Sequence, residues 1–144
     1  MEHWDVVIVG AGPAGLCAGL YCGRAKLRTL VIDKMAPGGA LLITDAVEDY
    51  PGFERVSGIE LAERMEAQAR KFGAQFRTAE VRRIDVDGSS KLITTDDGQF
   101  STDAVIITSG STPNRLGVPG EERRHAVPTT DIRIRKEVNT HEIS

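Results

Sequence analysis

Three glycines and an aspartate near the start of the chain have the types and spacing needed to hold a phosphate-bearing nucleotide. Gly10, Gly12 and Gly15 form a G-x-G-x-x-G pattern, and Asp33 follows at the distance expected of a ribose-binding acid. In this pattern the first glycine permits a tight turn and the second lets the backbone approach a pyrophosphate. The third lets a helix pack closely on a sheet. Together the four residues predict a dinucleotide site.

Two strands and a helix are expected to position this motif. Val6–Val9 is a β-branched apolar run, typical of a strand buried on both faces of a parallel sheet. Pro13 suits a first helical turn, and the N-terminus of that helix offers unpaired N–H groups to a phosphate. A second apolar run, residues 27–33, ends at the aspartate, and Gly19 is expected on the same helix face as Gly15. An ordinary strand–helix–strand unit, whose glycines serve only its turn, is the alternative.

The length and charge of the chain are those of an ordinary globular domain. It has 144 residues and a net charge of −3, with acids and bases mixed. This length suits one domain with a real core, and this charge does not favour nucleic acid or an anionic membrane surface. No apolar run reaches transmembrane length, and residues 1–4 lack the features of a signal peptide. We therefore expect a cytoplasmic protein without a nucleic-acid or membrane partner.

The two cysteines, Cys17 and Cys22, both fall in the expected first helix. Their spacing is not that of a Cys-x-x-Cys redox pair, and two positions on one helix cannot easily be bridged by a disulfide. They are either reactive thiols or small buried residues, and we favour buried residues.

The segment after Asp33 is expected to contain a turn, a long loop and a second helix. Pro37-Gly38-Gly39 marks the turn, and residues 44–53 form an aperiodic loop that ends in Tyr50-Pro51-Gly52-Phe53. Ser57 and Glu60 form a capping box at the start of the helix, and Gly73 ends it. Leu61 or Ala62, Met65, Ala69 and Phe72 are its expected core positions, with the ion pairs Glu60–Arg64 and Glu66–Arg70 on the other side.

Residues 75–108 change to the rhythm of strands. Asp96-Asp97-Gly98 is a hairpin signal between two of them. The expected strands are Gln75–Thr78, a segment around Val81–Val86, Lys91–Thr95, an antiparallel return over Gln99–Thr102, and a buried run over Ala104–Ile107.

The last 24 residues contain neither glycine nor aromatic residues. Arg133, Arg135 and Lys136 could form an anion patch, but a solvated tail is the simpler interpretation. His3, His125 and His141 lie near the start of the chain or in this segment, and we nominate no catalytic residue.

Taken together, Gly10–Gly15, Pro37–Gly39, Tyr50–Phe53 and Leu116–Glu121 resemble the FAD-binding domain of low-molecular-weight thioredoxin reductases. The resemblance extends over residues 5–122. It implies an α/β, Rossmann-like FAD/NAD(P)-binding fold with a parallel sheet plus a small antiparallel β-meander. We expect this domain to occupy residues 1–122, incomplete relative to the family, and a divergent polar tail to occupy 123–144.

The resemblance also implies roles for individual residues. The glycine turn would hold the FAD pyrophosphate, and Asp33, where the family usually has glutamate, would bond the adenosine ribose. Gly38, Gly39 and Leu41 would lie along the flavin side. Ala40 stands in place of a usual glutamine, and Asp49 in place of a usual asparagine. The candidate cofactor-binding residues are Gly10, Gly12, Pro13, Ala14, Gly15, Asp33, Lys34, Gly38, Gly39, Leu41, Asp49, Thr108, Ser109 and Gly110.

The family's second glycine motif, its redox cysteine pair and its closing Gly-Asp turn have no counterpart in this sequence. We therefore expect the FAD-binding portion of a flavoprotein disulfide oxidoreductase that is not catalytically complete alone, with NADPH bound only if a partner supplies its site. A non-catalytic flavin or nucleotide-binding module, working with an NADPH-domain partner chain or as a homodimer, is a second hypothesis. A folded fragment without cofactor and an NAD-dependent dehydrogenase are the others.

Overall fold

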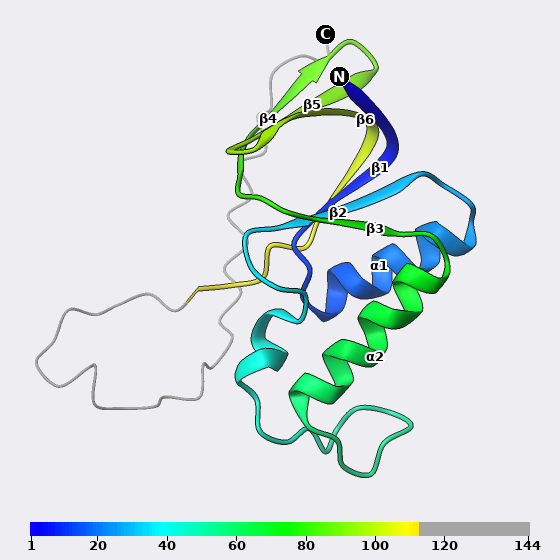
Figure 1. Cartoon of the computed structure of the whole chain (residues 1–144), viewed down its shortest axis with the longest axis vertical. Helices are drawn as coiled ribbons and strands as arrows, with labels where there is room; N and C mark the ends of the chain where they lie inside the picture. The colour runs from blue at the N-terminus through cyan, green and yellow to red at the C-terminus, as the bar shows by residue number, and fades with distance from the viewer. Residues whose placement is uncertain (113–144) are drawn as a thin grey trace, which may run out of the picture. The chain divides into compact units, whose positions relative to one another are not determined.

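A computed structural model of the chain describes residues 1–112 and shows one mixed sheet with two main helices (Figure 1). Met1–Gly110 forms one compact unit. The strand order is β3-β2-β1-β6-β5-β4. The elements are β1 (Glu2–Val9), α1 (Pro13–Arg24), β2 (Thr29–Asp33), the 3-10 helix η1 (Gly39–Ile43), α2 (Gly58–Lys71), β3 (Gln75–Thr78), β4 (Val81–Asp87), β5 (Ser90–Thr95) and β6 (Gly98–Ile107). The predicted motifs at Leu116–Glu121 and in the tail lie outside the described residues.

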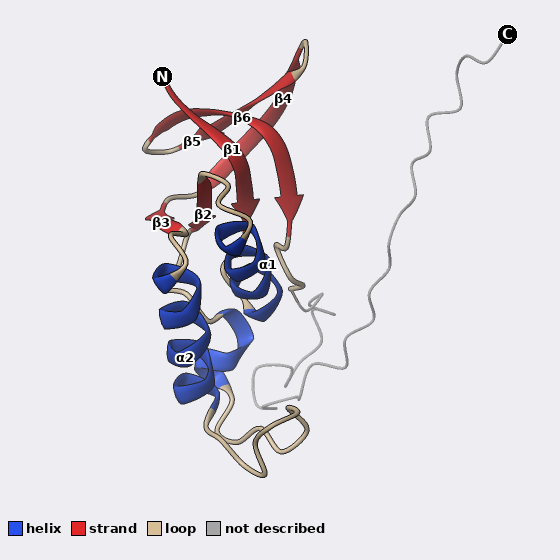
Figure 2. Ribbon diagram, turned by 90° about the vertical axis from the view of Figure 1, so that its right-hand side faces the viewer, coloured by secondary structure: helices blue, strands red, loops and turns tan. Residues whose placement is uncertain are grey.

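The parallel half of the sheet is built around β1. Both β2 and β6 pair with β1 in parallel, and β3 pairs in parallel with β2. Val7 and Ile8 are fully buried, which confirms that this β-branched run is a strand covered on both faces. The helices α1 and α2 lie together on one side of the sheet (Figure 2). The expected α/β fold with a parallel sheet and an antiparallel meander is confirmed.

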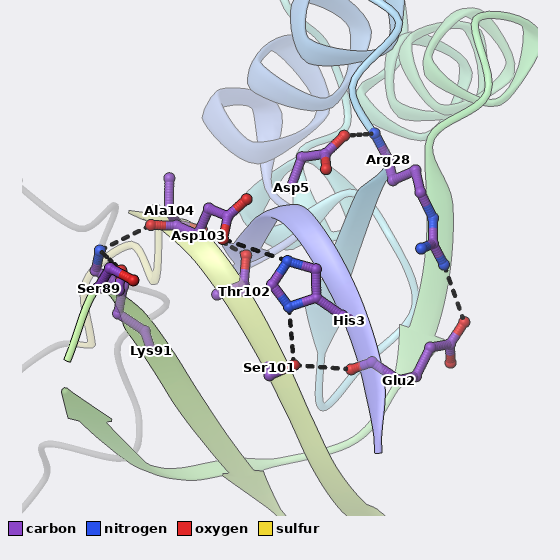
Figure 3. Close-up of polar contacts among 10 residues, drawn as sticks. All are labelled: Glu2, His3, Asp5, Arg28, Ser89, Lys91, Ser101, Thr102, Asp103 and Ala104. Carbon is purple, nitrogen blue, oxygen red and sulfur yellow. Dashed lines mark hydrogen bonds and ion pairs between the residues drawn. The ribbon is translucent and has the colours of Figure 1, made fainter. Parts of the chain in front are cut away.

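A single strand, β6, links the parallel half to the meander. It pairs antiparallel with β5 over Gly98–Thr102 and parallel with β1 over Phe100–Ile107. The sequence predicted two separate segments here because the exposed Asp103 interrupts the apolar pattern. That residue does not interrupt the backbone: its carboxylate lies 3.2 Å from His3 Nε2, and its carbonyl accepts a hydrogen bond from Lys91 Nζ at 2.7 Å (Figure 3).

Helix α2 begins and ends at the predicted residues. Ser57 Oγ accepts a hydrogen bond from the Glu60 N–H at 3.1 Å, and Gly73 follows the helix with a φ of 97°. The Glu60 carboxylate does not reach back to the cap as predicted. It accepts from Arg64 instead, so half of the capping box forms.

One of the expected core positions of α2 is wrong. Leu61 and Ala69 are buried, but the Phe72 side chain is 38% exposed and lies under the Arg24 guanidinium, 5.3 Å from the ring centroid. The cause is the close approach of the two helices, because a Cβ at Gly23 of α1 would lie 2.7 Å from the Phe72 carbonyl oxygen. Backbone occupies the interface at this point, and the ring lies outside it.

The cysteines are both in α1, as predicted, but they are not both buried. Gly15, Leu16, Gly19 and Gly23 form the buried face of the helix, and Cys17 points away from it into solvent. Cys22 is half-buried, and burial raises the pKa of its thiol. Within residues 1–112, no helix is long and apolar enough to cross a membrane.

Candidate functional site

The carboxyl ends of three parallel strands bring the predicted glycine turn, Asp33 and Thr108 to one edge of the sheet. β1 continues into the turn, and its Gly10 N–H donates to Ile32 O of β2 at 2.8 Å. On the other side of β1, the Thr108 N–H donates to Val9 O at 2.8 Å. In open α/β sheets this edge is where ligands bind.

Two glycines of the turn are required by packing. A Cβ at Gly10, whose φ is 108°, would lie 2.2 Å from Thr108 O, and a Cβ at Gly15 would lie 1.9 Å from Gly10 O. No side chain fits at such distances from backbone atoms. These contacts confirm the tight turn and the close helix packing that the spacing predicted.

Gly12 is different, because nothing in the described part of the chain requires it to be glycine. Its φ of −70° and ψ of −177° suit any residue, and the nearest atom to an added Cβ would be Gly39 Cα at 4.0 Å. Gly39 of η1 lies close to this backbone, because a Cβ at Gly39 would lie 3.0 Å from Gly12 Cα. In dinucleotide sites the second glycine of the motif is free of a side chain so that a pyrophosphate can approach the backbone, and the conformation of Gly12 is compatible with that role.

The first turn of α1 faces the same space. Gly12 is the N-cap and supplies no side-chain hydrogen bond, and its carbonyl accepts the first helical bond from the Leu16 N–H at 2.9 Å. Pro13 has no N–H, so the N–H groups of Ala14 and Gly15 are the ones that a helix start leaves without intrahelical partners. These groups and the helix dipole favour an anion.

The Asp33 carboxylate is held by backbone at the end of β2. Its Oδ2 accepts from the Ala11 N–H at 2.6 Å, and its Oδ1 accepts from the Met35 N–H at 3.0 Å. A carboxylate has about four acceptor positions, so each oxygen retains capacity for a further donor such as a ribose hydroxyl. The hydrogen bond from the Ala11 N–H holds the Asp33 carboxylate against the glycine turn.

Thr108 and Gly38 hold the turn from its two sides. The Thr108 hydroxyl lies 2.9 Å from Gly10 O and 3.1 Å from Val9 O, and the Gly38 N–H donates to Ala11 O at 2.8 Å. Ser109 and Gly110 follow Thr108 and are exposed.

The other predicted residues lie farther along the loops. Lys34 is exposed directly after β2, Leu41 is half-buried in η1, and Asp49 is exposed in the loop before α2. The backbone of η1 packs against the start of α2, where a Cβ at Gly58 would lie 2.1 Å from Leu41 O.

Sequence reasoning missed a small cavity beside Asp33. Its volume is about 60 Å³, and Arg70, Phe76, Arg77 and Thr78 line it together with Ala11 and the aspartate. Arg70 was predicted only as the partner of Glu66 on the outer side of α2. That ion pair forms, at 2.7 Å, but the guanidinium also lies over the Phe76 ring of β3. The two residues are close in sequence, but neither the helix pattern of α2 nor the strand pattern of β3 predicts a contact across the turn between them.

A larger cavity, of about 450 Å³, lies between α2 and the loop that carries Tyr50 and Phe53. Leu61 and Met65 form part of its apolar wall. The aromatic residues of the Tyr50–Phe53 motif therefore line a groove of their own, and none of the glycine-turn residues line it.

Comparison with known proteins places the chain among flavoenzyme sequences. The sequence profile of the pyridine nucleotide-disulphide oxidoreductase family matches residues 4–141. Thioredoxin reductase of Bacillus subtilis (strain 168) is 42% identical over 120 residues, and that of Treponema pallidum (strain Nichols) is 47% identical over 119 residues. The crystal structure of Lactococcus lactis thioredoxin reductase (FR conformation) matches with a TM-score of 0.79 at 38% identity.

The chain spans about two fifths of the length of these relatives. The matches cover 83% and 82% of this chain but 38% and 39% of the Bacillus and Treponema proteins. For the Lactococcus structure the shares are 83% and 40%.

Proposed function

The chain belongs to the pyridine nucleotide-disulphide oxidoreductase family and corresponds to the FAD-binding portion of a thioredoxin-reductase-like flavoprotein, and we propose that its glycine turn and Asp33 hold the adenosine diphosphate half of FAD. The observation that carries this proposal is that Gly12 has a backbone conformation open to any residue, and that an added Cβ there would make only one ordinary contact with the described residues. Packing requires glycine at positions 10 and 15, whereas a bound pyrophosphate would account for the glycine at position 12.

In this proposal each residue at the carboxyl ends of β1, β2 and β6 has one role. The N–H groups of Ala14 and Gly15 bind the pyrophosphate, and Asp33 accepts hydrogen bonds from the ribose. Thr108 keeps the turn in place through Gly10 O. The flavin supplies the electron-transfer chemistry when it is bound, and these residues orient it.

We propose that the whole protein is a flavin-dependent disulfide reductase of the thioredoxin reductase type. The nicotinamide site and the redox dithiol of that reaction would then lie outside these 144 residues, because the sequence has neither a second glycine motif nor a Cys-x-x-Cys pair. The activity thus needs a further segment or a partner chain.

The free side of β6 supports a partner at this position. Successive backbone groups of a strand point in opposite directions, and the Thr108 N–H points to β1, so those of Val105 and Ile107 point away from β1. β5 pairs with β6 only as far as Thr102, and no other described strand reaches residues 105–107 on that side. We propose that these residues, the open edge of β6, accept a strand from a further segment, a partner chain or a second copy.

Nucleotide titration of the full chain tests the proposal. We expect ADP and FAD to bind, and Gly12→Glu to abolish binding because its side chain and charge would fill the pyrophosphate space. Ala67→Glu, which adds the same charge on the exposed surface of α2, is the matched control and should bind as the wild type does. Equal ADP binding by Gly12→Glu and Ala67→Glu would contradict the proposal.

An absorbance spectrum separates the flavoprotein from a nicotinamide-dependent dehydrogenase. A protein that retains added FAD through desalting shows flavin absorption bands, whereas a colourless protein that binds NAD in preference to FAD would favour the dehydrogenase.

A further inference from the structure

Arg70, on α2, reaches both β3 and the cavity beside Asp33. Its guanidinium carbon lies 4.3 Å from the centroid of the Phe76 ring, and its Nε donates to Glu66 at 2.7 Å. It also lines the cavity beside Asp33. We infer that Arg70 is a specificity-determining residue on which the adenine ring of a bound nucleotide stacks, an inference that rests on the proposed function.

The position of the cavity follows from the chemistry of the nucleotide. In the proposed function Asp33 binds the ribose, and the base is attached to that same ribose. Asp33, Arg70 and Thr78 all line this cavity. It is too small for a whole dinucleotide, but it adjoins the proposed ribose position and can take part of the attached base.

The charges around the cavity favour a neutral flat ring over a second phosphate. Arg70 is paired with Glu66, and Arg77 is paired with Asp97 through its Nε at 2.6 Å. Each arginine thus has its own carboxylate, and Asp33 adds a further negative charge. A paired guanidinium keeps its planar face for stacking, while the neighbouring carboxylate offsets its attraction for a phosphate.

The same charges predict selectivity within adenosine nucleotides. A phosphate on the ribose 2′-hydroxyl would lie next to the Asp33 carboxylate, and the two arginines of residues 1–112 that line the cavity are already paired. The site should therefore take ADP and FAD and reject dinucleotides that carry a 2′-phosphate.

Calorimetric titration of the full chain with ADP and with 2′,5′-ADP tests this inference. We expect Arg70→Ala to weaken ADP binding by about five- to tenfold, because the loss of a cation–π stack has this magnitude. Arg70→Lys should weaken binding nearly as much, because an ammonium keeps the charge but not the planar face. The wild type should bind ADP at least about tenfold more tightly than 2′,5′-ADP.

Arg64→Ala is the matched control. Arg64 lies on the same helix and pairs with Glu60 in the same i,i+4 arrangement. Its guanidinium carbon lies 5.5 Å from the Phe53 ring centroid, but Arg64 does not line the small cavity beside Asp33. This variant should bind ADP as the wild type does, and its melting temperature shows what the loss of such a pair costs the fold.

Several outcomes would overturn the inference. Unchanged ADP affinity in Arg70→Ala, or wild-type affinity in Arg70→Lys, would show that no stack on the guanidinium forms, and the proposed function would stand. Equal binding of ADP and 2′,5′-ADP to the wild type would refute the charge argument. A wild-type chain that binds neither ADP nor FAD would refute the proposed function, and the inference with it.

Discussion

At the scale of single residues, Gly12 and Gly15 of the glycine turn differ in the contacts that an added methyl group would make. At Gly15 it would collide with the Gly10 carbonyl, and at Gly12 its nearest neighbour among the described residues would be Gly39 Cα at 4.0 Å. The sequence motif does not distinguish the two positions. The structure separates Gly15, which the packing requires, from Gly12, which the packing of the described residues does not require.

This difference predicts opposite effects of two alanine substitutions. Gly15→Ala should lower the free energy of unfolding by about 2 kcal/mol or more, because α1 must move away from the turn. Gly12→Ala should change it by less than about 0.5 kcal/mol and weaken ADP binding instead. Urea denaturation of both variants measures the first effect and nucleotide titration the second. Equal destabilisation by the two substitutions would contradict the packing argument.

The two thiols of α1 should differ in reactivity. Burial raises the pKa of the Cys22 thiol, so at a given pH a smaller fraction of it is the reactive thiolate, whereas Cys17 is exposed. We expect iodoacetamide to modify Cys17 several-fold faster than Cys22 at mildly alkaline pH, as followed by mass spectrometry of tryptic peptides. The rate at Cys22 should rise with pH as its thiol ionises. Equal rates at both residues would show that Cys22 is not shielded in solution.

At the scale of elements, the start of α2 rests on one half of a capping box. Ser57→Ala should therefore destabilise the protein by about 1 kcal/mol, because it leaves the Glu60 N–H without its acceptor. Glu60→Ala should cost less than about 0.5 kcal/mol, since it removes only an exposed pair with Arg64. Chemical denaturation of the two variants provides the comparison. A larger loss in Glu60→Ala than in Ser57→Ala would mean that the reciprocal cap forms in solution.

The elements that the sequence predicted well are those whose signals are local. The β-branched run of β1, the serine before α2 and Gly73 after it each act within a few residues, so their types determine the structure there. The glycine turn between β1 and α1 is specified in the same way.

The features that sequence analysis missed depend on how one element packs against another. Nothing near Asp103 indicates that β6 continues through it, because the reason is a pairing with β1 about a hundred residues away. Phe72 lies outside the core because the distant helix α1 approaches the end of α2 at Gly23. Arg70 and Phe76 are close in sequence, but their contact depends on how the turn after α2 orients β3. The geometry of the glycine turn and of Asp33 was therefore predictable, whereas the cavity beside them was not.

At the scale of the whole molecule, the proposed partner strand has a consequence for the isolated chain. The side chain of Ile107 is 67% exposed at the end of the open edge of β6, and edge strands with free backbone groups and apolar side chains associate with each other. We therefore expect the isolated chain to self-associate with increasing concentration, as measured by analytical ultracentrifugation. Ile107→Lys should shift it towards the monomer, because a lysine on an edge strand opposes strand addition. Ile59→Lys places the same charge on exposed α2 and should leave the association unchanged. If both variants associate as the wild type does, the contact lies elsewhere and the open edge does not recruit a second copy. If only Ile107→Lys is monomeric, β6 is the edge at which a further strand of the flavoprotein would join the sheet.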